Sequence, residues 1–260
     1  MSALEINFWL FVAICAATWL TSIITKEYSW VDRIWSIIPI AYMWVFAYGA
    51  NFSDVRLNVM AVLVTLWGAR LTFNFARKGG YAPGGEDYRW AILRKKMSPV
   101  VYQIFNIFFI VIFQNALLLA ITLPANLALE NRTDFGLLDV VFSALFLGFL
   151  IYEFIADQQQ WNFHQLKKAG KASGFLDKGL FATSRHPNFF AEQAQWWVLG
   201  FWGFAVANTA QPVYLLGAVI LTALFLGSAR FTEQISLSKY PDYKQYQSRV
   251  SMLIPWFSKK

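Results

Sequence analysis

Residues Val100–Leu123 read VVYQIFNIFFIVIFQNALLLAITL, a long run without a single charged side chain. An α-helix of this length can cross the roughly 30 Å hydrocarbon layer of a bilayer. Just before the run, Ser98 and Pro99 supply a capping side chain and a proline at the first helical position, the usual signs of a helix start. The stretch therefore predicts a transmembrane helix.

Outward from this stretch the same pattern recurs along the chain. Further apolar blocks of spanning length are Phe8–Thr25, Ile34–Ala50, Leu57–Phe75, Leu137–Ile155, Phe189–Ala207 and Pro212–Ala229. We therefore predict an all-α fold: a polytopic integral membrane bundle of about seven transmembrane helices, forming a single domain over residues 1–260. The second span is the least secure, because Pro39 lies inside it and proline breaks a helix interior.

The composition excludes other classes of protein. Of the 260 residues, 57% are hydrophobic and 14% are charged, whereas soluble domains carry charge on about a quarter of their residues. The long apolar blocks exclude a soluble Rossmann enzyme, a secreted scaffold and a disordered chain, and they lack the short alternation of an outer-membrane barrel. The lone cysteine, Cys15, lies within an apolar block, so disulfides are not expected. The net charge of +7 comes from loops and supplies no basic helix, so nucleic acid is not an expected partner.

Basic residues in the loops predict the orientation of the chain. They gather in the regions Arg77–Lys96, Lys167–Arg185 and Lys239–Lys260, while the opposite loops hold only Arg56 and Arg132. Cytoplasmic loops of membrane proteins are enriched in Lys and Arg. We therefore expect a multi-pass protein with its N-terminus outside and its C-terminus in the cytoplasm. Its expected partner is the lipid of the bilayer.

Ionisable residues of the spans collect at the predicted cytoplasmic ends of the helices. These residues are Asp32, Arg33, Arg70, Glu153, Asp157, Glu192, Arg230 and Glu233. Near the bilayer centre such a side chain costs roughly 2.5–3.5 kcal/mol on insertion scales. Their collection on one side predicts a polar cavity that opens to the cytosol.

Simpler explanations stay open for these residues. Arg70 can extend to the lipid headgroups, and Arg230 can pair with the acid three residues along its helix. Glu153 and Asp157 can be plain interfacial acids. A metal site made from those two acids and His164 lacks the usual ligand spacing, and we predict no metal.

Two polar segments border the predicted spans. Gly79–Gly85 is rich in glycine and leads into Glu86–Arg89, a pattern that is also typical of a linker. Gly179–Gln193 places Arg, His, Asn, Glu and Gln among aromatic residues where a helix enters the membrane. Because a helix N-terminus presents free N–H groups and a positive dipole end, this segment suits phosphate or carboxylate oxygens; ordinary helix capping is the alternative.

The segment GLFATSRHPNFFAE, from Gly179 to Glu192, resembles the C-terminal region of the steroid 5α-reductase superfamily. Within that superfamily the chain is most similar to a branch of membrane proteins described as a domain of unknown function. Three further segments fit that branch: Tyr240–Trp256 (YPDYKQYQSRVSMLIPW), Trp67–Leu71 (WGARL) and Gly85–Arg89 (GEDYR). The resemblance covers nearly the whole chain and is most specific in its C-terminal half.

This resemblance implies a seven-helix fold that binds NADPH from the cytosol and reduces the double bond of an apolar enone or another lipid or steroid-like substrate. The cofactor-binding half would cover about residues 135–260. The positions that match the family's cofactor contacts are Asp157, Asn188, Glu192 and Arg230, with Arg185, His186 and Tyr243 as their neighbours.

The sequence departs from the steroid reductases at one position of the implied catalytic site. Trp67 lies three residues before Arg70, where the family has a tyrosine that polarises the substrate carbonyl together with a glutamate. Asp32 is the candidate for the place of that glutamate. Hydride addition to an enone needs an electrophile at the carbonyl oxygen. The catalytic candidates are therefore Tyr88, Arg70 and a protonated Asp32, in that order.

Two other functions remain open. The Arg-His-Pro-aromatic helix entry and the Ile-Pro ending also resemble isoprenylcysteine carboxyl methyltransferases, which bind S-adenosylmethionine. A lipid- or sterol-binding membrane protein without catalysis would explain the cavity and the aromatic residues. It would not explain why acids and bases gather beside helix N-termini.

Overall fold

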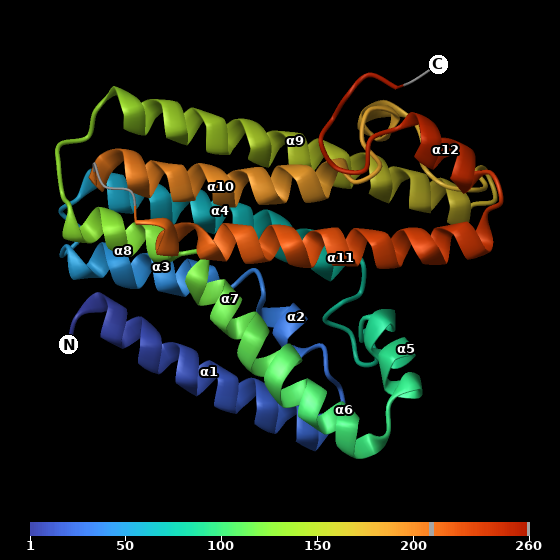
Figure 1. Ribbon diagram of the computed structural model, residues 1–260, viewed down its shortest axis with the longest axis horizontal. Helices are drawn as coiled ribbons and strands as arrows, with labels where there is room; N and C mark the ends of the chain where they lie inside the picture. Colours follow the sequence, from blue (N-terminus) through green and yellow to red (C-terminus); the bar gives the residue numbers. More distant parts are fainter. Residues whose placement is uncertain (208–210, 259–260) are drawn as a thin grey trace. The chain divides into compact units, whose positions relative to one another are not determined.

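The computed structural model describes residues 1–207 and 211–258, with the side chains of residues 88 and 89 excepted (Figure 1). Over these residues the chain is helical, with an isolated β-bridge between Ser184 and Ser251. The prediction of an all-α fold is confirmed. The contacts divide the chain into two compact units: unit 1 comprises Met1–Ser143 and Leu199–Gly217, and unit 2 comprises Ala144–Val198 and Ala218–Lys260. That these units form a single domain stays a prediction.

In the described part of the chain, five helical segments are long and apolar enough to cross a membrane. They are α1 (Ala3–Thr25), α4 (Val55–Arg77), the run Pro99–Glu130, α9 (Leu137–Lys168) and the run Pro212–Lys239, which contains η3 (Pro212–Leu215) and α11 (Leu216–Lys239). These helices mark a multi-pass membrane protein, as predicted. The predicted count of about seven spans is not confirmed.

The two other predicted spans, Ile34–Ala50 and Phe189–Ala207, are not among the five segments that are long and apolar enough to cross a membrane. The block Ile34–Ala50 is divided into α2 (Trp30–Ile34) and α3 (Ile38–Gly49), and Pro39 lies in the first turn of α3. A proline fits the first turn of a helix but not its interior, so the break falls just before it. The block Phe189–Ala207 lies in α10 (Pro187–Ala207), a helix of 21 residues.

The stretch Val100–Leu123, which predicted a membrane helix, is not a single regular α-helix. It comprises α6 (Pro99–Phe105), the π-helix η1 (Asn106–Phe113) and α7 (Gln114–Ala120), and α8 (Leu123–Glu130) follows after a short break. Asn106 Nδ2 donates to Ser22 Oγ of α1 over 3.0 Å. Asn115 Nδ2 donates to Thr18 Oγ1 over 3.3 Å. Such hydrogen bonds between helices are typical of membrane proteins, where lipid offers polar groups no other partner.

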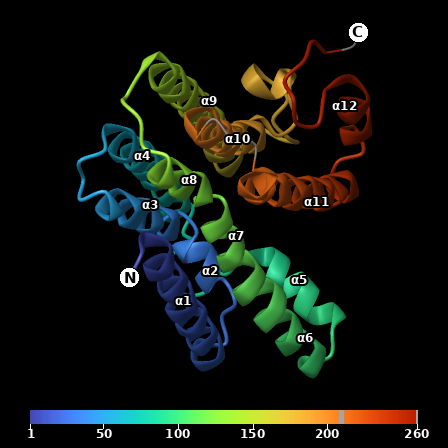
Figure 2. The same ribbon diagram turned by 60° about the vertical axis from the view of Figure 1, so that its left-hand side comes forward.

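Helix α4 is packed closely against the α2–α3 segment in unit 1. A Cβ atom at Gly68 of α4 would lie 2.3 Å from the carbonyl oxygen of Ser36, so only glycine permits this approach. Trp44 Nε1 of α3 donates to Thr65 Oγ1 of α4 over 3.0 Å. Helix α8 contacts both α3 and α4, and the three helices lie side by side (Figures 1 and 2).

A buried ion pair links α4 to the start of α9 within unit 1. The side chains of Arg56 and Asp139 are each 2% exposed, and Arg56 Nε lies 2.5 Å from Asp139 Oδ1. The indole of Trp202, in α10, donates to the same oxygen over 2.6 Å. Nothing near Asp139 in the sequence indicates that Arg56 reaches it, because the two residues are 83 positions apart.

Unit 2 contains the later part of α9, the start of α10, most of α11, and α12 (Tyr243–Arg249). Gln195 of α10 donates to Glu153 of α9 over 2.7 Å, and Trp197 Nε1 of α10 donates to Thr222 Oγ1 of α11 over 3.0 Å. Between α9 and α10 lies the 3-10 turn η2 (Gly179–Ala182). These contacts place Glu153 of α9 against Gln195 of α10 and join α10 to α11.

Candidate cofactor site

A row of polar side chains lies between α9 and α10 inside unit 2. Asp157 of α9 is 3% exposed, and Asn188 Nδ2 of α10 lies 3.4 Å from its Oδ1 atom. Glu192 follows Asn188 by one helical turn and is also buried, and its Oε1 atom accepts from Trp196 Nε1 over 3.2 Å. The structure therefore gathers three of the predicted cofactor residues along one helix interface.

Two further residues extend this row and were not assigned to the cofactor from the sequence. Glu153 precedes Asp157 by one turn of α9, and its Oε2 atom accepts from Gln195 Nε2 over 2.7 Å. Gln195 is fully buried, and its Oε1 atom has no hydrogen-bond partner among the described residues. The signal was present in the spacing, because Gln195 lies three residues after Glu192 and so shares its face of α10. We call Glu153, Asp157, Asn188, Glu192 and Gln195 the polar row.

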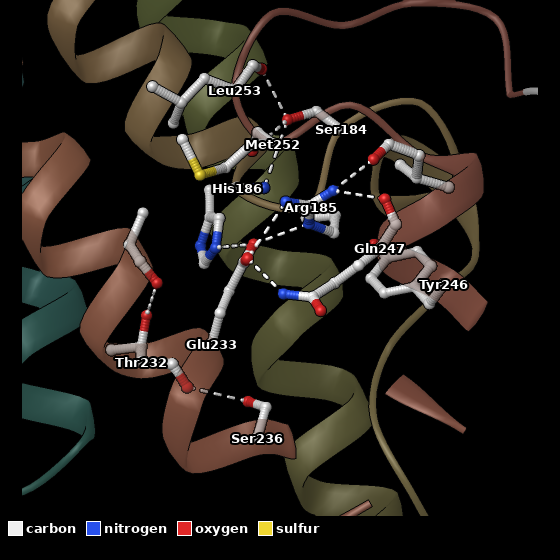
Figure 3. Close-up of polar contacts among 12 residues, drawn as sticks. Ser184, Arg185, His186, Thr232, Glu233, Ser236, Tyr246, Gln247, Met252 and Leu253 are labelled. Carbon is white, nitrogen blue, oxygen red and sulfur yellow. Dashed lines mark hydrogen bonds and ion pairs between the residues drawn. The ribbon is translucent and has the colours of Figure 1, made fainter. Parts of the chain in front are cut away.

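Arg185 and His186 belong to a different network, which is centred on Glu233 of α11 (Figure 3). The Glu233 carboxylate accepts from Arg185 Nε over 2.6 Å and from Arg185 Nη2 over 3.1 Å. It also accepts from Gln247 Nε2 over 2.6 Å, and His186 Nε2 lies 3.0 Å from Oε1. Arg185 Nη1 donates to the carbonyl oxygens of Gln247 and Val250. In the structure, this arginine binds α11 and α12 through its side chain.

The Arg185 network also holds the closing segment, Ser251–Phe257. The backbone N–H groups of Arg185 and His186 donate to the carbonyl oxygens of Ser251 and Met252, over 2.8 and 3.1 Å. The N–H of Trp256 donates to the carbonyl oxygen of Thr183 over 3.0 Å. Residues 183–186, which precede the helix that was predicted to enter the membrane, therefore pair with residues 251–256. Nothing in the sequence indicated this pairing.

Tyr243 packs into an aromatic cluster at the start of α12. Its ring centroid lies 4.9 Å from that of Phe175 and 5.5 Å from that of Tyr246. Burial raises the pKa of the Tyr243 hydroxyl to about 12. Its contact with a cofactor stays a prediction.

Arg230 is exposed on α11, one turn before Glu233. Glu233 is engaged by Arg185, His186 and Gln247. Among the salt bridges between described residues, Glu233 pairs with Arg185 and His186 and not with Arg230. An ion pair with Glu233, the simple alternative that the sequence left open, therefore does not explain why an arginine occupies position 230.

The three predicted catalytic residues belong to unit 1. Asp32 of α2 is half-buried, and its Oδ2 atom accepts from Trp90 Nε1 over 2.7 Å. Arg70 is buried on α4. Tyr88 is the first residue of α5 (Tyr88–Lys96), and its side chain lies outside the described residues. Trp67, at the position where the reductases have tyrosine, is fully buried.

The glycine-rich segment Gly79–Gly85 is tied to the chain around Tyr28, unlike the free linker that remained an alternative. Glu27 Oε1 accepts from the N–H of Gly84 over 3.1 Å, and Glu86 Oε1 accepts from the N–H of Tyr28 over 2.7 Å. Arg33 forms a 2.7 Å ion pair with Glu27. The hydrogen bond from Arg33 lowers the pKa of the Glu27 carboxyl, which favours the charged form of Glu27 that accepts from Gly84.

A cavity of about 320 Å³ also occurs in unit 1, lined by residues 53–56 and 132–135. No residue predicted for catalysis or cofactor binding lines this cavity. The polar row and the Arg185 network are therefore the better candidates for function.

Comparison with known proteins gives a family. The family model described as "Protein of unknown function (DUF1295)" matches residues 18–250. A protein of Schizosaccharomyces pombe, described as uncharacterized, is 39% identical over 260 residues, which cover 91% of this chain and 75% of the relative. No solved structure matches the chain.

Proposed function

The chain belongs to the family of unknown function DUF1295, and from its polar row we propose that it is a membrane-embedded NADPH-dependent reductase. Its substrate would be an apolar enone or a similar lipid or steroid-like double bond. The observation that carries the proposal is the meeting of Asp157 and Asn188 at 3.4 Å, with Glu192 buried one turn away. These are residues that the resemblance to steroid reductases singled out.

The polar row suits the polar parts of a nicotinamide nucleotide. Carboxylates and an amide oxygen accept hydrogen bonds, and the carboxamide and ribose hydroxyls of the nucleotide donate them. Gln195 Oε1 is a buried acceptor without a partner among the described residues, a state that costs about 1–3 kcal/mol until a donor arrives. Bound in unit 2, the nucleotide would supply the hydride.

The phosphates of the nucleotide need cationic or N–H donors. Arg230 is exposed on α11 and has a guanidinium suited to bidentate phosphate contact. The first turn of α10 adds backbone N–H groups and the positive end of the helix dipole. In this proposal Arg185 acts indirectly, because its guanidinium holds Glu233 and the backbone of α12 in place.

Candidate groups for the substrate lie in unit 1. The Trp90 indole fixes the orientation of the Asp32 carboxyl through a 2.7 Å hydrogen bond. Arg70 is a buried cation that can stabilise negative charge on a carbonyl oxygen. In this proposal Arg70, Tyr88 or Asp32 polarises the enone, while the apolar body of the substrate enters from lipid.

Nucleotide titration of the detergent-purified protein tests the proposal. We expect NADPH to raise the melting temperature and the variants Glu192→Ala and Arg230→Ala to bind it about tenfold to hundredfold more weakly, since a lost charge-assisted hydrogen bond costs about 1.5–3 kcal/mol. Asp177→Ala and Lys239→Ala are matched controls, because both remove an exposed charge from unit 2.

The same titration separates the alternatives. A clear shift with S-adenosylmethionine and none with NADPH or NADH would contradict the reductase and favour a methyltransferase. A shift with sterol or lipid alone would favour a binding protein. If Arg230→Ala weakens NADPH more than NADH, its partner is the additional 2′-phosphate.

A further inference from the structure

The closing segment Ser251–Phe257 presents large apolar side chains away from the protein. Ile254 is 65% exposed, Trp256 is 69% exposed and Phe257 is 87% exposed. None of these residues lies in a helix. A surface helix facing lipid explains many of the other exposed apolar residues, such as Phe73 of α4 and Phe108 of η1, but it does not explain these.

Hydrogen bonds hold this segment in place. Besides the backbone bonds to Arg185, His186 and Thr183, Ser184 Oγ donates to the carbonyl oxygen of Leu253 over 2.6 Å. Ser184 is fully buried. These bonds hold the backbone from Ser251 to Trp256, so the exposure of Trp256 is part of the fold, and Phe257 follows it directly.

Contacts in unit 2 place this segment near a membrane surface. Both α9 and the run containing α11 are candidate membrane spans, and their ends meet, because Lys167 Nζ donates to Tyr240 OH over 2.8 Å. Glu233, which binds Arg185, follows Ala229, the last residue of the predicted apolar block, by four residues, or about 6 Å along a helix. The closing segment is joined to Arg185, so it lies near the end of the apolar part of α11; in Figure 1 it is the red stretch that leads to the C-terminus.

The chemistry of the segment fits the lipid headgroup region. Tryptophan favours the boundary between hydrocarbon and water, and exposed aromatic residues beside basic ones are typical of interfacial anchors. Lys244 and Arg249 are exposed on the adjacent α12, and Lys259 and Lys260 follow Phe257 in the sequence. Each basic residue near an anionic surface contributes about 1 kcal/mol of attraction. Residues 243–260 contain no acidic side chain that would oppose this attraction.

We propose that Ser251–Phe257 is an interfacial membrane anchor, with Trp256 and Phe257 inserted among the headgroups of an anionic lipid surface. The anchor sets the depth of the Arg185–Glu233 network relative to the bilayer, because the two are joined through backbone hydrogen bonds. The proposal does not depend on the reductase activity.

A single fluorescent label tests the anchor. The lone cysteine allows a Cys15→Ala background, in which Phe257→Cys carries a bimane label and Ser248→Cys, at an exposed and uncharged position of α12, is the matched control. The full chain is reconstituted in phosphatidylcholine vesicles with brominated acyl chains. We expect brominated lipid to quench the label at 257 several-fold more strongly than the label at 248, and aqueous iodide to show the opposite order.

Other outcomes would overturn the proposal. Equal iodide quenching at 257 and 248 would place the segment in water. Protection from iodide without quenching by brominated lipid would mean that protein, such as a second copy of the chain, covers it. Adding phosphatidylserine should strengthen lipid quenching at 257, and an unchanged value would remove the anionic preference. A label at Trp256→Cys repeats the measurement at a second position.

Discussion

Asp139 is a carboxylate in the interior of unit 1 whose oxygens both have donors. Oδ1 accepts from Arg56 Nε and from the indole of Trp202, and Oδ2 accepts from Arg56 Nη2 and from the N–H of Gly136. Arg56 also donates to Thr133 and to the backbone of Asp134. A buried ion pair repays its desolvation only when the remaining polar atoms are satisfied in this way.

We predict that Asp139→Ala strongly destabilises the protein, because it leaves the Arg56 guanidinium buried without its counter-ion. Removing one partner of a buried pair costs about 3–5 kcal/mol. The measurement is the melting temperature of the purified variant in detergent, compared with Asp134→Ala, which removes an exposed carboxylate from the same segment.

A double variant distinguishes pairing from loss of volume. Arg56→Met with Asp139→Leu removes both charges and fills the space, so it should recover a large part of the lost stability. An Asp139→Ala variant that melts with the wild type would show that this ion pair contributes little to unit 1.

At the scale of elements, the contact of α4 with the α2–α3 segment depends on one residue without a side chain. A Cβ atom on Gly68 would lie 2.3 Å from Ser36 O and 2.6 Å from the side chain of Ile40. Small residues allow membrane helices to approach closely, and this close packing holds helices together where lipid offers no hydrophobic drive.

We predict that Gly68→Ala lowers stability by about 1–3 kcal/mol, the usual cost of overpacking, because the Ser36 backbone cannot move away freely. Gly148→Ala in α9 is the control, since a Cβ atom there meets nothing within 4 Å. The control should be neutral or gain up to about 1 kcal/mol from helix propensity.

Thermal unfolding of both variants in one detergent provides the comparison. If Gly68→Ala and Gly148→Ala melt alike, the close approach of α4 is not needed for stability. A third substitution, Gly68→Leu, should prevent folding of unit 1 if the contact is as tight as the structure indicates.

At the scale of the whole chain, the loop charges predict its orientation in the membrane. Three basic regions follow apolar blocks on one predicted side, while the other side holds only Arg56 and Arg132. Arg56 is moreover paired with Asp139 inside unit 1.

We predict that a reporter fused after Lys260 lies in the cytoplasm and that a tag at Met1 is accessible only from outside, because cytoplasmic loops retain positive charge. Protease accessibility of both tags in sealed vesicles measures this. Removal of both tags from the same face would contradict the odd number of crossings that this orientation requires.

The sequence alone determined the class of the fold. Hydropathy and charge are properties of consecutive residues, so Val100–Leu123 and the loops around it were enough to predict an all-helical membrane protein. Proline and capping signals are equally local, and the break before Pro39 was foreseen at the weakest of the predicted spans. The number of spans was not determined, because the length of an apolar block does not show where a helix ends.

Part of the candidate site was also within reach of the sequence. Asp157, Asn188 and Glu192 were named from a resemblance between motifs, and the contact of Asp157 with Asn188 agrees with their grouping. Their partner Gln195 could have been found from helical spacing, whereas its pairing with Glu153 required the packing of α9 on α10.

Only the tertiary structure decided which charged residues meet across long stretches of chain. Arg185 could bind a phosphate or a carboxylate on sequence grounds, and the structure gives it Glu233 and the backbone of α12. Arg56 and Asp139 belong to separate helices, and nothing near either one in the sequence indicates the other. A local pattern fixes what a residue can bind, but the packing of helices fixes which group lies within the few ångströms over which a hydrogen bond forms.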